Sequence, residues 1–259
     1  MSSQTLIITG ASRGIGAATA HAAAALGANV VLCARSETAL AVVARQITEA
    51  GGHALAVVAD VSNREDCQRL VSAALERFGS LDAVVSNAAT LDPVEPIATS
   101  APEAWHRALT VNVIGPVMLA QAALPHLRAR NGRVIDVTSG AAGLPLSGLS
   151  AYCASKAALN IFGQCLAKEE PEITVISFDP GTVDTAMHSF IRAEGQPAML
   201  PADYAMFVGL HEQGHLRPPE DPGRALAHVA LRAPREWSGA VMAWDDPRVQ
   251  SLMVRTSES

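Results

Sequence analysis

Residues 6–16, Leu-Ile-Ile-Thr-Gly-Ala-Ser-Arg-Gly-Ile-Gly, decide the fold of this 259-residue chain. An apolar run typical of a buried strand leads into a turn with the glycine spacing G-x-x-x-G-x-G, and an Ala-rich segment then predicts a helix through about Leu26. A strand, a glycine turn and a helix in this order are typical of a dinucleotide phosphate site. The helix would offer free N–H groups and its positive dipole end, and the glycines would let the ligand approach closely. The alternative is an ordinary glycine-rich turn.

Strand candidates recur along the whole chain, with helical stretches between most of them. They cover residues 5–9, 29–33, 54–59, 83–86, 134–138, 174–178 and 239–244. This alternation predicts an α/β fold, namely a single-domain, Rossmann-type, doubly wound parallel sheet with helices on both faces. We expect one domain over residues 1–259, with a cofactor half at about 1–140 and a catalytic and substrate half at about 141–259. The Gly- and Pro-rich segment 184–219 is predicted to be irregular and to form a lid.

Composition narrows the function classes. Apolar residues make up 49% and charged residues 17% of the chain, as in a globular protein, and the net charge of −6 offers no basic footprint for nucleic acid. No basic and apolar leader and no apolar run of membrane length is present, so we expect no membrane partner and a cytoplasmic location. The four cysteines lack metal-ligand spacing and are expected to be reduced thiols.

A tyrosine and a lysine lie four positions apart in the predicted helix 150–167. Tyr152 and Lys156 therefore share one helix face. An ammonium near a phenol favours phenolate, so we expect the phenol's pKa to fall from about 10 toward neutrality. Tyr152 is thus a candidate general acid and base. The spacing alone is weak, because Tyr and Lys meet in this way by chance in many helices.

Together these residues resemble the short-chain dehydrogenase/reductase family along nearly the whole chain. Six segments match the family's motifs in the right order: residues 9–16, Asp60-Val61, Asn87-Ala88-Ala89, Asn112, Ser139 with Tyr152 and Lys156, and residues 180–185. Ala89 stands where the family usually has glycine. The resemblance implies an oxidoreductase that acts on an alcohol or carbonyl group with a nicotinamide cofactor.

The resemblance also implies the catalytic roles. A carbonyl oxygen would sit between Ser139, which donates a hydrogen bond, and Tyr152, which delivers the proton. Lys156 would lower the pKa of Tyr152 and hold the cofactor ribose, and Asn112 would anchor a water that links Lys156 to solvent. Thr138, Ser147 and Ser150 are rival hydroxyls. Ser139 is preferred because it lies thirteen positions before Tyr152, as the family's serine does.

The choice of cofactor follows from charge. NAD enzymes of this fold carry an acid after the second strand to bind the ribose 2′-hydroxyl. Here that strand is followed by Arg35 and Ser36, and Arg13 in the glycine turn adds a second guanidinium. Guanidinium groups pair well with phosphate, so the sequence favours NADP(H) over NAD(H).

The residues expected to bind the cofactor come from all of the matched segments and from the end of the second strand. They are Gly10, Ser12, Arg13, Gly14, Ile15, Gly16, Arg35, Ser36, Asp60, Val61, Asn87, Ala88, Tyr152, Lys156, Pro180, Gly181, Val183 and Thr185.

A zinc-protease pattern needs separate treatment. His211-Glu212-Gln213-Gly214-His215 spells H-E-x-x-H. That chemistry requires both histidines on one face of a stable helix and a third ligand, whereas Gly214 interrupts the run and Pro218 follows it. We expect no metal here.

Four segments resemble the sepiapterin reductase branch of the family, which includes benzil reductases: residues 87–91, 152–154, 167–171 and 239–246. The branch implies that Asp246, or Asp245 beside it, reaches the substrate. We therefore expect reduction of a small-molecule ketone or 1,2-dicarbonyl, sepiapterin- or benzil-like, by a homodimer or homotetramer. A reductase of 3-oxoacyl thioesters, another alcohol dehydrogenase of the family and an NADP(H)-binding regulator without turnover are the alternatives.

Overall fold

The computed structural model describes residues 3–254 and contains one parallel sheet of seven strands. The strand order is β3-β2-β1-β4-β5-β6-β7, so the chain changes direction between β1 and β4, where ligands of this fold class bind. The predicted doubly wound sheet is confirmed, and each strand lies within a residue or two of its predicted position. The strands are β1 (Thr5–Thr9), β2 (Asn29–Ala34), β3 (His53–Val58), β4 (Ala83–Ser86), β5 (Arg133–Val137), β6 (Thr174–Asp179) and β7 (Ala240–Ala243).

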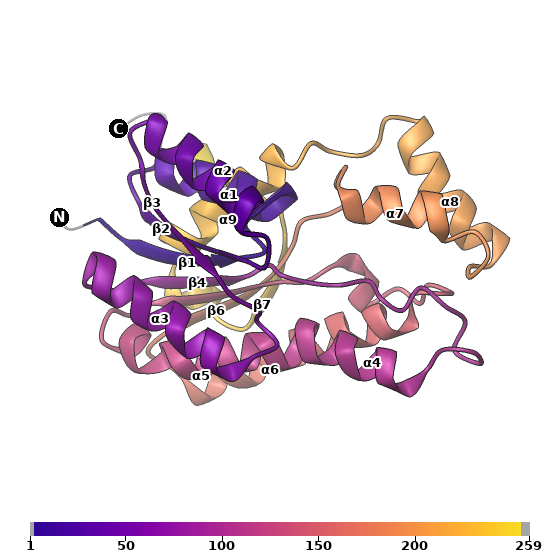
Figure 1. Cartoon of the computed structure of the whole chain (residues 1–259), viewed down its shortest axis with the longest axis horizontal. Helices are drawn as coiled ribbons and strands as arrows, with labels where there is room; N and C mark the ends of the chain where they lie inside the picture. Colours follow the sequence, from indigo (N-terminus) through magenta and orange to yellow (C-terminus); the bar gives the residue numbers. More distant parts are fainter. Residues whose placement is uncertain (1–2, 255–259) are drawn as a thin grey trace.

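Helices cover both faces of the sheet (Figure 1). One apolar layer lies under α1 (Gly14–Ala25), α2 (Glu37–Glu49), α9 (Glu220–Arg232) and α10 (Pro247–Val254). The other lies under α3 (Arg64–Phe78), α5 (Gly115–Arg128) and α6 (Ser150–Glu169). Two short 3₁₀ turns complete these connections, η2 (Gly140–Ala142) and η3 (Arg235–Trp237).

Helix α5 continues α4 (Pro102–Leu109) through a single π-helical turn, η1 (Thr110–Ile114). The combined helix Pro102–Arg128 is long and apolar enough, by length and composition, to cross a membrane. Its apolar residues have a place in the fold, however, because Leu119, Ala123 and Leu127 are fully or almost fully buried in the layer beneath α3 and α6.

The segment 184–219 is mostly helical, so the prediction that it is irregular is wrong, whereas its role as a lid stays a prediction. It contains α7 (Ala186–Glu194) and α8 (Pro201–Glu212), which lie beyond the carboxyl ends of the strands (Figure 1). The Thr185 hydroxyl caps α7 by accepting from the His188 amide, and Pro201 occupies the first turn of α8. The glycines and prolines mark the ends of these helices and the loops beside them.

The predicted lid segment, residues 184–219, is tied to the loop before α6. The amide and hydroxyl of Ser147 both donate to the Asp203 carboxylate, and the Ser147 hydroxyl accepts from the Leu200 amide at 2.7 Å. Gly148 beside it has φ +73°, and a Cβ there would lie 2.8 Å from the Ala198 carbonyl oxygen. Glycine at this position therefore lets the lid approach closely.

At the opposite edge of the sheet, one carboxylate organises the strand starts. Asp82 Oδ2 accepts from the buried Thr5 amide at 2.9 Å and from the Ser80 hydroxyl at 3.2 Å, while Oδ1 accepts from Arg130 at 3.0 Å. The residue is 5% exposed. Asp82 thus gives the buried amide at the start of β1 its hydrogen-bond partner.

Asp82→Ala should lower the free energy of unfolding by about 1–3 kcal/mol, because the buried Thr5 amide loses its partner. Arg130→Ala is the matched control: its side chain is 41% exposed, and loss of such an ion pair costs less than about 1 kcal/mol. Urea unfolding of both variants measures the difference. Equal small losses would show that the buried amide does not need the carboxylate.

Candidate active site

The β1–α1 turn is shaped by close backbone approach. Gly10 and Gly14 have φ values of +64° and +57°, and a Cβ on Gly16 would lie 2.4 Å from the Gly10 carbonyl oxygen. Helix α1 begins after Arg13, which has extended backbone and provides no side-chain cap. The first N–H groups of α1 are therefore not satisfied by a capping side chain, as a site for a pyrophosphate requires.

Asn87, predicted to bind the cofactor, holds this turn in place. Its side-chain amide donates to the carbonyl oxygens of Thr9 at 2.9 Å and Gly10 at 3.3 Å. The backbone amides of Asn87 and Ala88 both donate to the Thr9 hydroxyl. The structure thus gives Asn87 a positioning role, and direct cofactor contact stays a prediction.

The two arginines expected to read a 2′-phosphate lie at the same edge of the sheet. The Ala11 amide donates to the Cys33 carbonyl oxygen at 3.0 Å, which ties the glycine turn to the end of β2, where Arg35 follows. Arg13 and Arg35 are exposed, and within residues 3–254 neither forms a recorded ion pair. Both guanidinium groups are therefore available to an anion.

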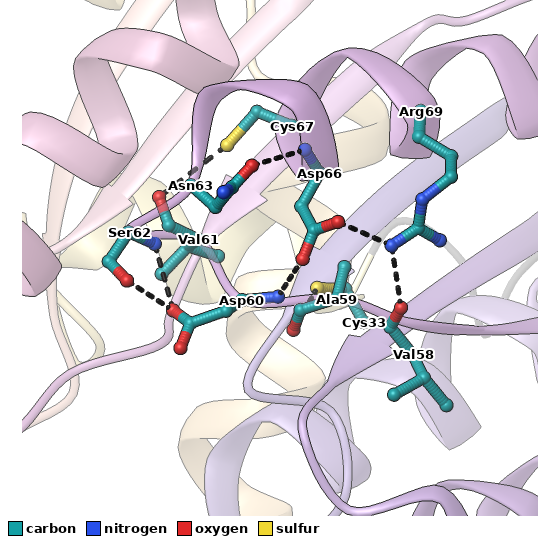
Figure 2. Close-up of polar contacts among 10 residues, drawn as sticks. All are labelled: Cys33, Val58, Ala59, Asp60, Val61, Ser62, Asn63, Asp66, Cys67 and Arg69. Atoms are coloured by element: carbon teal, nitrogen blue, oxygen red, sulfur yellow. Dashed lines mark hydrogen bonds and ion pairs between the residues drawn. The ribbon is translucent and has the colours of Figure 1, made fainter.

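The loop after β3 is held by a small polar network, which Figure 2 shows. The Asp60 amide donates to the Asp66 carboxylate at 2.8 Å, and Asp60 Oδ1 accepts from the amide and hydroxyl of Ser62. The Asp60 amide and the Arg69 guanidinium hold the pKa of Asp66 below its usual range. The network fixes Asp60, and Val61 after it, in the loop that follows β3.

The segment after β6 faces the glycine turn. A Cβ on Gly14 would lie 3.5 Å from Thr185 Cγ2. Gly181 has φ +72°, and a Cβ at this position would lie 3.1 Å from the Trp244 ring. Val183 pairs with Arg217 in a parallel β-bridge. The structure therefore brings Thr185 next to Gly14 in the predicted phosphate site.

The predicted catalytic residues meet at the end of β5. Lys156 is 3% exposed, and its Nζ donates to the Val137 carbonyl oxygen at 2.6 Å and lies 5.6 Å from the centre of the Tyr152 ring. Ser139 follows β5 by two residues and begins η2, where its hydroxyl accepts from the Ala141 amide at 3.2 Å. Helix α6 and strand β5 thus place the phenol, the ammonium and the serine together.

The pKa of Tyr152 shifts in the direction opposite to the prediction. Burial raises it to about 12, and the Ser139 hydroxyl beside the phenol offsets only part of that rise. The Lys156 ammonium bonds to the Val137 carbonyl oxygen and lies 5.6 Å from the centre of the Tyr152 ring, and burial of the phenol outweighs its attraction for the phenolate. The phenol is consequently protonated at neutral pH, which is the form that can donate a proton.

The structure favours Ser139 over two of the rival candidates for the catalytic hydroxyl, Ser147 and Thr138. Ser147 is engaged by Asp203 and Leu200 in the lid. Thr138 is only 2% exposed. Of these three hydroxyl groups, Ser139 is the one that hydrogen-bonds the Tyr152 phenol and lowers its pKa.

Asn112 is buried in the π-helical turn, and its side chain is fully engaged. Its Oδ1 accepts from the Thr90 amide at 2.8 Å, while Nδ2 donates to the Thr90 carbonyl oxygen at 2.9 Å and to Ser155 Oγ at 3.0 Å. The side chain therefore ties η1 to α6 and to the loop after β4. A catalytic water on Asn112 stays a prediction.

An apolar cluster that the sequence did not reveal packs against Tyr152. Its buried members come from the loops after β4 and β5, from α7 and α8 and from the turn between those helices: Leu91, Ala141, Leu146, Leu149, Ile191, Met199 and Phe207. We call it the lid cluster. No local pattern predicts it, because its members are far apart in sequence and belong to five different segments.

Asp246, predicted to meet the substrate, has a partner within the chain. Both of its carboxylate oxygens accept from the Arg248 guanidinium, at 3.0 and 2.8 Å, and this pairing holds its pKa below the usual range. A substrate role for Asp246 would have to break this bidentate pair, so the structure lends it no support.

The H-E-x-x-H run does not form one helix face. Helix α8 ends at Glu212, and Gly214 has φ +68°, so His215 lies outside the helix that carries His211. Among residues 3–254 there is no group of three potential metal ligands.

Comparison with known proteins agrees with this geometry. Residues 4–196 match the family model for short chain dehydrogenases. An uncharacterised oxidoreductase of Saccharomyces cerevisiae is 34% identical over 96% of this chain and 99% of its own. Its crystal structure matches with a TM-score of 0.91.

Two further matches bear on chemistry. A benzil reductase of S. cerevisiae, described as forming (S)-benzoin, is 32% identical over 95% of this chain and 97% of its own. The structure of a variant of actinorhodin polyketide ketoreductase with NADPH is 25% identical, has a TM-score of 0.84 and covers 94% of this chain and 97% of its own. The chain belongs to the short-chain dehydrogenase family and is an oxidoreductase acting on CH–OH or C=O groups.

Proposed function

We propose that this protein is an NADPH-dependent carbonyl reductase that converts a ketone or 1,2-dicarbonyl into an alcohol. The observation that carries this proposal is the protonated, half-buried Tyr152 phenol, which lies beside Ser139 and Lys156 and packs against the lid cluster. It combines a proton donor with an apolar wall, as reduction of an apolar carbonyl compound requires.

The residues that would hold NADP(H) fit it. The backbone amides at the start of α1 suit the pyrophosphate, and the exposed Arg13 and Arg35 suit a 2′-phosphate. The NADPH-bound ketoreductase among the similar structures supports the same choice. When bound, NADPH supplies the hydride.

The chain's own groups handle the proton and the developing charge. The Ser139 oxygen accepts from the Ala141 amide, and its O–H, which lies beside the Tyr152 phenol, would donate to a carbonyl oxygen bound between the two hydroxyls. Tyr152 donates its phenolic proton to the substrate's carbonyl oxygen as that oxygen gains negative charge. The Lys156 ammonium then stabilises the phenolate that remains, because opposite charges attract strongly in a buried site.

The lid cluster indicates the substrate class. Leucine, isoleucine, methionine and phenylalanine side chains pack with Tyr152, so the surroundings of the phenol are apolar and suit alkyl or aryl groups. The similarity to benzil reductase supports an aryl 1,2-diketone. A pterin is disfavoured, since the carboxylate expected to bind its N–H groups is paired with Arg248.

Tyr152→Phe should lower kcat for ketone reduction by roughly 10²–10⁴-fold, because the proton donor is lost while the ring remains. NADPH oxidation with benzil as substrate measures kcat, and NADPH fluorescence titration checks that cofactor affinity is unchanged. Retention of more than about a tenth of the wild-type kcat would exclude the phenol as the general acid.

Arg35→Ala should raise the KM for NADPH by roughly tenfold or more and leave the KM for NADH within about twofold, since a charged hydrogen bond to phosphate contributes about 1.5–3 kcal/mol. Arg45→Ala is the matched control, because Arg45 lies on α2 in an exposed ion pair with Glu49. Parallel changes for the two cofactors would show that Arg35 does not contact the 2′-phosphate.

A further inference from the structure

A row of polar side chains crosses the sheet beneath α6. The strand register aligns Ser86 of β4 with Asp136 of β5, and Asp136 with Ser177 of β6. All three residues are buried, with Asp136 at 0% exposure. By strand alternation they share the face of Val84, Val134 and Val175, which is the apolar layer under α3, α5 and α6.

Helix α6 lies directly over this row. A Cβ at Gly163 would be 3.1 Å from Ser177 Oγ and 3.8 Å from Asp136 Oδ2. Lys156 lies on the same helix face as Gly163, seven positions earlier, with Asn160 between them. The Lys156 ammonium bonds to the carbonyl oxygen of Val137, the residue that follows Asp136. The buried carboxyl and the buried ammonium thus belong to one polar cluster.

The carboxyl group of Asp136 is poorly satisfied. Within residues 3–254 its oxygens, like Ser86 Oγ, Thr138 Oγ1 and Asn160 Oδ1, lack a well-formed hydrogen bond, although the adjacent Ser86 hydroxyl favours the ionised carboxylate. A buried carboxyl without partners costs several kcal/mol relative to an apolar side chain. Its placement next to a buried ammonium suggests an electrostatic task instead.

The charges around Lys156 are few. Burial lowers the pKa of Lys156 to about 8, and two carboxylates oppose that shift, Asp136 beneath it and Asp179 at the end of β6. Burial in turn raises the pKa of Asp136 to about 7, against the smaller effects of Ser86 and Lys156. Tyr152 is protonated and neutral in this range.

We propose that Asp136 is a positioning residue whose buried carboxylate acts as the internal counter-charge of Lys156. This inference rests on the proposed reductase function. Above neutral pH the ionised carboxylate keeps the ammonium charged beside Tyr152. Below neutral pH the carboxyl is uncharged, and the ammonium is stable without it.

Asp136→Asn tests the proposal with nearly unchanged shape, and Ser177→Ala is the matched neutral change in the same row. Asp136 raises the pKa of Lys156, and losing a neighbouring opposite charge lowers a buried lysine's pKa by about one unit. The kcat for NADPH-dependent benzil reduction by Asp136→Asn should therefore be within about twofold of wild type at pH 6 and roughly fivefold or more lower at pH 8. Ser177→Ala should keep the wild-type profile. A loss for Asp136→Asn that is equal at all pH values, or a profile that matches Ser177→Ala, would overturn the proposal.

A second readout needs no substrate. The folded pKa of Asp136 is raised from 3.8 to about 7, so its contribution to stability is present at low pH and is lost as pH rises through that window. The Tm of wild type should therefore fall relative to that of Asp136→Asn, and of Asp136→Ser as a second variant, between about pH 4 and 7. In a Lys156→Met background, which lacks the ammonium, this Tm difference should extend to higher pH, because the carboxylate has lost its counter-charge. A pH dependence that Lys156→Met leaves unchanged would overturn the counter-charge. If wild type reduced no ketone, the proposed function would fail while this readout still decided the role of Asp136.

Discussion

The bond between the Lys156 ammonium and the Val137 carbonyl oxygen is the constraint on which the site depends. An ammonium buried to 3% exposure requires a hydrogen-bond acceptor, and the last carbonyl of β5 provides it at 2.6 Å. This bond fixes α6 along the sheet, so that Tyr152, one turn earlier, lies close to Ser139, two residues beyond the same strand. The phenol and the serine are thus placed by the contact that buries the lysine.

The predicted cofactor site depends on close backbone packing in the glycine turn. Gly16 leaves no room for a Cβ against the Gly10 carbonyl and the Asn87 amide, and Asn87 ties the turn to the end of β4. Because parallel strands end at one edge, the glycine turn and the loops after β2, β3 and β6 gather along that edge. The apolar lid cluster then covers Tyr152 from the other half of the chain.

Much of this arrangement could be predicted from the sequence, because it depends on local patterns. All seven strands follow from apolar runs, and the glycine turn and the Tyr152–Lys156 pair follow from spacing. The sequence does not predict α7 and α8, because the glycines and prolines that end these helices are equally typical of an irregular segment. Their anchor, the contact of Ser147 with Asp203, spans 56 residues and leaves no local pattern.

Electrostatics was the least predictable part. The pKa of Tyr152 depends on how deeply packing buries the phenol, and that burial outweighs the neighbouring ammonium. The side chain of Asn112 is engaged by Thr90, whose position depends on the loop after β4. The Asp246–Arg248 pair, in contrast, is separated by only two residues and could have been considered from the sequence.

Hydride transfer from NADPH to a ketone is the central claim, and isotope labelling tests it most directly. The protein would be incubated with benzil and NADPH deuterated at the transferable position, and the product analysed by mass spectrometry and NMR. The account predicts an α-hydroxy ketone that carries the deuterium on its carbinol carbon. Unlabelled alcohol, or no alcohol from benzil or from a panel of aryl and alkyl 1,2-diketones, would contradict it.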